Sequence, residues 1–151
     1  MTESFEIVIP ALLRAARGAY GHAIREQLAA GSFDDMPQNG PFVLGGMANH
    51  GVAPGDLIRQ LGVSKQAASQ LVDTLVLRGY LERRLNAEDR RRIDIELTDR
   101  GRAAAQAVRA GVESVDDELA RRLSPIEMSG LVAGLVALTA IREEAEEAAR
   151  A

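Results

Sequence analysis

The sequence predicts a mainly α-helical fold that contains one β-hairpin. Apolar residues recur at helical spacing in long segments near both ends of the chain, where alanine is common. In the middle, the turn Gly62–Ser64 separates two shorter helical patterns. Further along, the isoleucines and leucine of Ile93–Leu97 alternate with acidic residues, which is the two-residue period of a half-buried strand. Together these patterns indicate helices arranged around a small hairpin.

The composition is that of a folded, globular chain. With 151 residues, 46% of them hydrophobic, the chain is long enough to bury a core, and we expect a single domain spanning 1–151. We expect no apolar run that spans a bilayer, and the acidic N-terminus lacks the basic start of a signal peptide. The prediction is therefore a cytoplasmic protein with no membrane partner. Cysteine is absent, which excludes disulfides, thiolate metal sites, cysteine nucleophiles and cysteine-based redox sensing.

Charge is distributed unevenly along the chain. The net charge is -4, which by itself argues against binding to nucleic acid. Residues 59–92, however, contain eight Lys or Arg and only four Asp or Glu, so the acidic excess lies entirely in the flanks. This asymmetry is what a local polyanion-binding face on an acidic, soluble body would produce.

The N-terminal part is predicted to form two helices joined by a loop. A long amphipathic helix is expected from about Ile9 to Ala30, because apolar side chains recur there near helical spacing. Glycine, proline and Asx residues predict a loop over Gly31–Pro41. Phe42–Asn49 is expected to be helical although Gly45 and Gly46 each weaken it by about 1 kcal/mol relative to alanine. The two glycines leave open a close contact with a neighbouring helix.

The middle of the chain predicts a helix-turn-helix. Pro54 suits the first turn of a short helix that stops at Gly62. Ser64 is a natural N-cap for a second helix, which Gly79 ends. The outer face of that second helix carries Gln66, Ser69, Gln70 and Asp73, with Lys65 beside them in the first turn, and the Gln, Ser and Lys side chains can contact bases or phosphates. The alternative is an ordinary solvent-facing stripe.

A basic hairpin follows the helix-turn-helix. Leu81–Leu85 supplies the outgoing strand, Asn86–Arg91 the tip, and Ile93–Leu97 the returning strand. Three consecutive arginines, Arg90 to Arg92, lie on or beside the tip, and the guanidinium group presents a planar set of donors to phosphate. The alternative is a solvated turn whose arginines pair with neighbouring acids. Three helices plus this hairpin make a winged helix-turn-helix.

Two long helices are predicted after the hairpin. Thr98 can cap the first, from about Asp99 to Leu123, and Ser124–Glu127 has the Ser, Pro and Glu of a capping box that starts the second. The terminal helices present more apolar surface than the small core needs, so we expect them to form a homodimer, with a monomeric bundle as the alternative. The predicted dimerisation region is 5–33 and 103–151, and the predicted winged-helix region is 41–101.

The segment Phe42–Gly101 resembles the MarR family of bacterial winged-helix transcription regulators. The matching stretches are PGDLIRQLGVSKQAASQLVDTLVLRGYLERR and NAEDRRRIDIELTDRG. The second is the more specific, because it has the family's Asp and, two residues later, Arg at the tip of the wing, followed by Leu-Thr and a nearby Gly. Here these residues are Asp89, Arg91, Leu97, Thr98 and Gly101. The sequence departs from the family at Ala87, where a proline is common, so the turn is expected to be looser.

The resemblance implies a homodimer that binds a pseudo-palindromic operator in double-stranded DNA, most often as a repressor. It implies base or phosphate contacts for the start and outer face of the second helix (Ser64, Lys65, Gln66, Ser69 and Gln70), a minor-groove role for Arg91 and a bracing role for Asp89. Chemistry alone adds Arg84, Arg90 and Arg92 as phosphate contacts.

Many such regulators respond to small aromatic or phenolic effectors. The resemblance implies a pocket between the dimer helices and the winged helix, and six side chains are candidates for its lining: Arg14, Tyr20, His22, Phe33, Met47 and His50. Each of them is equally compatible with ordinary surface or core.

Two other classes of function compete with this interpretation. An enzyme has little support, because adjacent Ser64 and Lys65 diverge on a helix and the two histidines lack metal-ligand spacing. We therefore predict no catalytic residue, no metal and no cofactor. A winged-helix adaptor that binds a protein and not DNA remains open, since the net charge is acidic.

Overall fold

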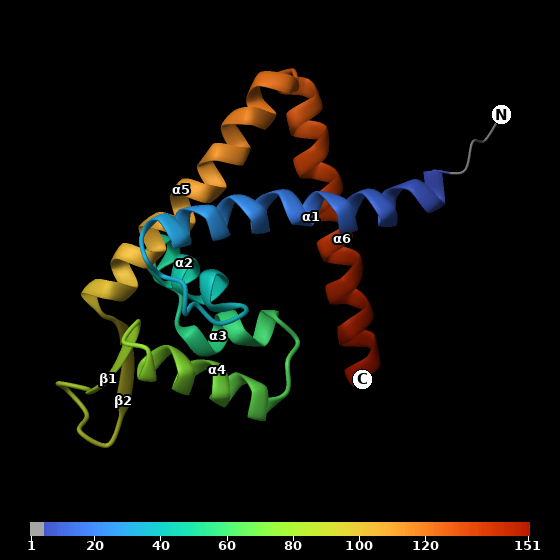
Figure 1. Cartoon of the computed structure of the whole chain (residues 1–151). Helices are drawn as coiled ribbons and strands as arrows, with labels where there is room; N and C mark the ends of the chain where they lie inside the picture. Colours follow the sequence, from blue (N-terminus) through green and yellow to red (C-terminus); the bar gives the residue numbers. More distant parts are fainter. Residues whose placement is uncertain (1–4) are drawn as a thin grey trace. The chain divides into compact units, whose positions relative to one another are not determined.

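The computed structural model of the protein describes residues 5–151, with side chains from Val8 onward, and contains six helices and two strands over that range (Figure 1). In chain order they are α1 (Phe5–Ala30), α2 (Gly40–His50), α3 (Pro54–Gln60), α4 (Lys65–Leu77), β1 (Leu81–Leu85), β2 (Ile93–Leu97), α5 (Asp99–Arg122) and α6 (Pro125–Arg150). The predicted mainly helical winged helix-turn-helix is confirmed. The chain divides into two compact units, one ending at Glu113 and the other comprising Ser114–Ala151.

Local side-chain contacts fix the helix starts. The Ser64 hydroxyl oxygen accepts a hydrogen bond from the Ala67 N–H at 3.1 Å and so caps α4. At the start of α6, the Glu127 carboxylate accepts from the Ser124 N–H at 2.8 Å, while the Ser124 hydroxyl oxygen accepts from the Glu127 N–H at 3.3 Å. Both predicted caps, including the reciprocal capping box, are confirmed.

The core lies within the first compact unit. Its largest fully buried side chains come from α2 (Val43 and Leu44), from α4 (Leu75), and from the residues that lead into the hairpin (Tyr80 and Leu81). Further buried side chains come from the end of α1 and from α5, namely Leu28, Ala104, Ala105 and Val108. The winged-helix region is therefore packed around its own apolar centre.

Gly46 allows α2 and α3 to pack closely. A Cβ atom at this position would lie 2.4 Å from Cδ2 of Leu57, a buried core residue. Gly45 is less constrained, because a Cβ there would meet only Val108, at 3.6 Å. For Gly46, the close helix contact that the sequence left open is confirmed.

The hairpin is buried only at its base. The two strands pair antiparallel, with Leu81 opposite Leu97 and Leu85 opposite Ile93. Leu81 is 1% exposed, whereas Leu85 is 68% and Ile93 is 59% exposed. The predicted half-buried strand thus holds for Ile95 and Leu97, which are partly buried against the core, but not for Ile93, because the hairpin extends beyond the core there.

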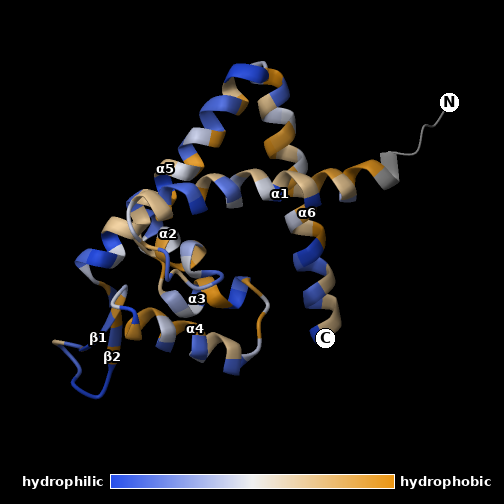
Figure 2. Cartoon of the chain, in the orientation of Figure 1, coloured by the Kyte–Doolittle hydropathy of each residue, from blue (hydrophilic) through white to orange (hydrophobic). Residues whose placement is uncertain are grey.

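Helix α6 buries none of its residues within the chain. Its exposed apolar side chains are Ile126, Leu131, Val132, Leu135, Val136, Leu138 and Ile141, and Figure 2 shows an apolar N-terminal part of α6 and a second apolar stretch at the start of α1. By length and composition alone α6 is able to cross a membrane, so the expectation that no apolar segment reaches that length needs correction. One such helix is weak evidence for a membrane span, because core helices of soluble proteins pass the same test.

Candidate nucleic-acid interface

Helix α4 presents one polar face and buries the other. Leu71 and Leu75 point into the core, while Lys65, Gln66, Ser69 and Gln70 are exposed. The Ser64 oxygen is engaged as the helix cap, which leaves the hydroxyl proton as its free donor. Because the helix N-terminus carries a partial positive charge, Lys65 and the first-turn amides together form a surface suited to phosphate.

Asn86 holds the tip of the wing. Its side-chain oxygen accepts hydrogen bonds from the N–H groups of Glu88 and Asp89, each at 2.9 Å, and its side-chain nitrogen donates to the Asp94 carboxylate at 2.7 Å. Its own N–H donates to the Arg92 carbonyl at 2.9 Å. Sequence reasoning did not single out Asn86, although an Asx residue at the start of a turn is a known signal. These bonds define the turn without the proline that Ala87 replaces.

Asp89 fixes the backbone that carries the arginines. Its carboxylate accepts a hydrogen bond from the Arg91 N–H at 3.0 Å, and its carbonyl accepts from the Arg92 N–H at 3.0 Å. Through these two bonds Asp89 sets the direction in which the side chain of Arg91 leaves the turn. This geometry supports the bracing role that the resemblance implies for Asp89.

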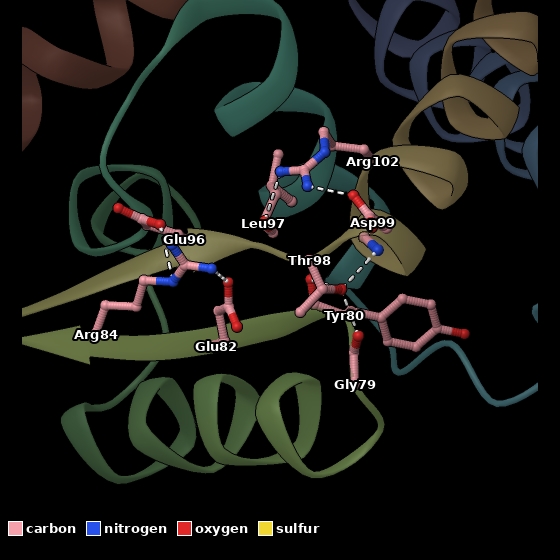
Figure 3. A network of polar contacts seen from close by, with 10 residues as sticks. Gly79, Tyr80, Glu82, Arg84, Glu96, Leu97, Thr98, Asp99 and Arg102 are labelled. Carbon is pink, nitrogen blue, oxygen red and sulfur yellow. Dashed lines mark hydrogen bonds and ion pairs between the residues drawn. The ribbon is translucent and has the colours of Figure 1, made fainter.

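The arginines of the wing differ in whether an acid already neutralises them. Arg84 pairs with Glu82 at 2.7 Å and with Glu96 at 3.5 Å (Figure 3), and Arg92 lies 3.4 Å from Asp94. Arg90 and Arg91 are exposed and have no ion pair within the described part of the chain. The solvated-turn alternative expected the tip arginines to be paired, and this describes Arg92 but neither Arg90 nor Arg91.

An ion pair joins the wing to helix α4. The Arg83 guanidinium lies 2.5 Å from the Asp73 carboxylate, so β1 and the polar face of α4 are held together. A groove of about 450 Å³ lies between α3, α4 and the hairpin, and its lining includes Arg59, Lys65 and Ser69. The Asp73–Arg83 ion pair was not predicted from the sequence, because only the fold brings these two residues into contact.

Thr98 and Gly101 close the base of the wing, and Figure 3 shows Thr98 beside Gly79 and Tyr80. The Thr98 hydroxyl donates to the Gly79 carbonyl at 2.5 Å, and its oxygen accepts from the Gly101 N–H at 3.0 Å. A Cβ at position 101 would lie 2.0 Å from the Tyr80 carbonyl oxygen, so no other residue fits there without displacing the backbone. These contacts explain why the wing motif has a threonine and a glycine at positions 98 and 101.

A larger cavity, of about 970 Å³, lies between α1, the loop 31–39, α2 and α5. Of the six predicted effector-pocket residues, Tyr20, Phe33 and His50 line it, whereas Arg14, His22 and Met47 do not. His22 instead lies 3.5 Å from Glu26 on the same helix. The lining also contains three arginines that the sequence analysis did not name: Arg17, Arg25 and Arg109. Over residues 5–151 no cluster of three or more His, Cys, Asp or Glu is arranged to hold a metal ion.

Comparison with known proteins finds that the winged-helix region is similar to one family. A sequence model described as the MarR family matches residues 41–92. The transcriptional repressor MprA of Escherichia coli is 40% identical over 53 residues, which is 35% of this chain and 30% of MprA. The transcriptional repressor YetL of Bacillus subtilis is 38% identical over 55 residues, 36% of this chain and 33% of YetL. The matched segment thus spans about a third of each curated relative.

Solved structures are similar over almost the whole chain. RV1404 from Mycobacterium tuberculosis is 26% identical, with a TM-score of 0.65, and the match covers 95% of this chain and 97% of RV1404. FabT from Streptococcus pneumoniae, solved in complex with DNA, has a TM-score of 0.75 over 93% of this chain and 98% of FabT, at 18% identity. At that identity the second match shows the fold alone. The long helices that flank the winged helix are thus part of a known architecture.

Proposed function

We propose that this chain is a DNA-binding transcription regulator of the MarR family, whose sequence model matches residues 41–92 and whose repressors are similar over about a third of the chain. The observation that carries the proposal is the state of the wing tip: Arg90 and Arg91 are exposed and unpaired within the described residues, on a turn that Asn86 and Asp89 hold in place. Exposed positive charge that no acid neutralises, on a turn held in place, suits a phosphate backbone or a minor groove. The protein therefore acts in the cytoplasm, on DNA, and not as an enzyme.

Each exposed group has a role in this proposal. Gln66, Ser69 and Gln70 face the major groove from α4, while Lys65 and the Ser64 hydroxyl contact phosphate at the start of that helix. Arg91 enters the minor groove and Arg90 contacts phosphate. Arg84 and Arg92 contribute less, because acids on the wing already neutralise them.

The protein acts as a homodimer in this proposal. Helix α6 and the start of α1 expose large apolar side chains, and a second copy of the chain would remove them from water. Two copies also place two recognition helices on the two half-sites of a pseudo-palindromic operator. Light scattering tests this directly: we expect twice the monomer mass, and a monomer at micromolar concentration would remove the dimer from the proposal.

We also assign the larger cavity to a small aromatic or phenolic effector that relieves repression. Tyr20, Phe33 and His50 supply its aromatic contacts, and the guanidinium groups of Arg17 and Arg25 favour an effector with a negative charge, whereas Arg109 already pairs with Glu113 at 2.6 Å. A panel of aromatic carboxylates and phenols, titrated into the preformed DNA complex, tests this assignment. We expect release by some members, weakened by Arg25→Gln but not by His22→Gln, because His22 lies outside the cavity. Release that both variants weaken equally would contradict the assignment.

The decisive experiment is fluorescence anisotropy with the DNA upstream of the protein's own gene, at two salt concentrations and with excess unrelated duplex. We expect specific binding that weakens steeply as salt rises, because each phosphate contact releases counterions. Arg91→Ala is expected to weaken binding without unfolding the protein, while Arg150→Ala, at the end of α6, is the control for the lost charge. Gln70→Ala is expected to change the preference among operator variants.

The outcomes separate the regulator from an adaptor. Absence of binding to that DNA, and to a random-sequence duplex library, by a correctly folded protein would favour a winged-helix module that binds another protein. In that case affinity for the protein partner would not depend on Arg91. Equal weakening by Arg91→Ala and Arg150→Ala would instead reduce the wing to a non-specific contribution of charge.

A further inference from the structure

Asp35 lies at the centre of a polar cluster that neither the recognition helix nor the wing tip explains. Its carboxylate accepts a hydrogen bond from the Tyr80 hydroxyl, and it accepts from the Arg100 guanidinium at 3.0 Å and 3.4 Å. Its backbone carbonyl accepts from the guanidinium of Arg78. Arg100 also donates to the Arg78 carbonyl, so two of the three partners are joined to each other as well as to Asp35.

The partners of Asp35 belong to the parts of the molecule that carry the DNA-facing surface. Arg78 is the C-terminal cap of α4, Tyr80 immediately precedes β1, and Arg100 is in the first turn of α5, just after β2. Asp35 therefore connects the end of the recognition helix, through its backbone carbonyl, with both ends of the wing hairpin, through its carboxylate. Tyr80 is fully buried, which anchors this connection in the core.

Aromatic contacts reinforce the cluster. The Arg100 guanidinium carbon lies 4.3 Å from the centre of the Tyr80 ring and 5.9 Å from that of Phe33. The rings of Phe33 and Tyr80 are 6.2 Å apart at an interplanar angle of 56°. Stacking against two rings fixes the plane of the guanidinium, and with it the direction of its hydrogen bonds to Asp35.

Electrostatics keeps the cluster in a single protonation state near neutral pH. The Tyr80 hydroxyl and then the Arg100 guanidinium hold the pKa of Asp35 below its ordinary value. Burial, and then the hydrogen bond to Asp35, raise the pKa of Tyr80 to about 12. The carboxylate is therefore charged and the phenol protonated, which is the combination that both hydrogen bonds need.

The loop that carries Asp35 is itself held at both ends. Ser32 and Asn39 have positive φ angles, 62° and 67°, a region that side chains other than glycine seldom adopt. The Phe33 N–H donates to the Leu28 carbonyl at 2.8 Å, which ties the loop to α1. Phe33 and Met36, from the same loop, also line the large cavity. A fixed loop of this kind provides a stable base for the carboxylate.

We infer that Asp35 is a positioning residue for DNA binding: through Tyr80, Arg78 and Arg100 it fixes the wing relative to the recognition helix, so that both reach DNA together. The inference rests on the proposed function. This role differs from a purely structural one. If Asp35 were only structural, loss of the carboxylate would lower the stability of the protein without changing the affinity of the folded protein for DNA. Asp35 touches no DNA in this arrangement and acts only through its partners.

A double-mutant cycle in DNA binding tests the inference. Asp35→Asn keeps the size of the side chain and removes its charge, and we expect it to weaken operator binding roughly threefold to tenfold at a temperature where the variant is fully folded. Asp34→Asn is the matched control, since it makes the same charge change on the same loop with no hydrogen bond or ion pair to Tyr80 or Arg100. Its effect should be small.

The decisive part is the combination with Arg91→Ala. If Asp35 acts by placing the wing, the loss caused by Asp35→Asn largely disappears once the wing arginine is gone, so the two effects are non-additive. Simple additivity, or an Asp35→Asn variant that binds like the wild type, overturns the inference. Failure of the wild type to bind any duplex defeats the proposed function instead, so the two failures are distinguishable.

Tyrosine fluorescence reports on the hydrogen bond between Tyr80 and Asp35 in the absence of DNA. The chain has no tryptophan and two tyrosines, so Tyr20→Phe leaves Tyr80 as the only strong ultraviolet emitter. A carboxylate that accepts a hydrogen bond from the phenol quenches tyrosine emission, and we expect Asp35→Asn, but not Asp34→Asn, to raise the emission of Tyr80. Unchanged emission in the Asp35→Asn variant would show that the hydrogen bond is not formed in solution, which also overturns the inference.

Discussion

The winged-helix region buries its large apolar side chains, whereas helix α6 leaves its own exposed. The first packs Leu44, Leu75, Tyr80 and Leu81 at 1% exposure or less, whereas α6 has no buried residue at all. Helix α4 of the winged-helix region and helix α6 both begin at a serine N-cap. Local signals thus suffice to form a helix but not to cover it, since α6 leaves its apolar side chains exposed in the single chain.

The largest expected loss of stability comes from a substitution in the buried core. Leu44→Ala removes a fully buried side chain from α2 and should cost about 2–5 kcal/mol in the free energy of unfolding. Leu135→Ala on α6 is the counterpart, because Leu135 is 42% exposed in the single chain. Urea denaturation at several protein concentrations is the measurement. We expect a loss independent of concentration for Leu44→Ala, and a loss that changes with concentration for Leu135→Ala. Identical behaviour of the two would contradict the distinction.

A pair of glycine substitutions gives the next effect. Gly101→Ala forces a Cβ to within 2.0 Å of the Tyr80 carbonyl oxygen, and we expect a destabilisation of about 1–3 kcal/mol, measured by thermal unfolding. Gly134→Ala on α6 meets nothing within 4 Å in the chain and should stabilise the helix by up to about 1 kcal/mol. Should Gly134→Ala destabilise the dimer instead, Gly134 lies where two copies approach closely.

Loss of a helix cap is expected to cost less, about 1 kcal/mol in either region. Ser64→Ala removes the acceptor for the Ala67 N–H at the start of α4, and Ser124→Ala removes half of the capping box of α6. Amide hydrogen exchange in the first turn of each helix is the measurement. Faster exchange confined to the mutated helix is the expected result. No change at α6 would mean that packing against a second copy, and not the cap, determines its first turn.

The smallest effect is a pH dependence that both regions share. Hydrogen bonds donated by Tyr80 and Arg100 lower the pKa of Asp35. Hydrogen bonds donated by the backbone and the hydroxyl of Ser124 lower the pKa of Glu127. A folded pKa below the unfolded one contributes stability that is present above the unfolded pKa and is lost as pH falls through the folded pKa. Asp35→Asn and Glu127→Gln should therefore lower Tm at pH 7 and converge with the wild type below about pH 3. Equal destabilisation at both pH values would contradict this linkage.

Much of the interface followed from short-range sequence signals. The caps at Ser64 and Ser124, the proline starts of α3 and α6, and the hairpin strands depend on residues within a few positions of one another, and all lie as predicted. The Asp and Arg of the wing motif are likewise local, because Asp89 contacts the backbone two residues away. The lining of the effector cavity was harder to predict, and only three of the six candidate residues line it. The direction in which a side chain on α1 points relative to the cavity depends on what α1 packs against.

By itself, the sequence determined the order of the elements, their ends and the concentration of positive charge at the wing, because periodicity, capping and charge are properties of neighbouring residues. Only the tertiary structure decided which apolar residues are buried, so that Leu81 is covered while Leu85, four residues later, is not. It also brought Asp35 to Tyr80, 45 positions along the chain, and Asp73 to Arg83. Such contacts depend on how far the core extends and on how helices approach, quantities that no local pattern encodes.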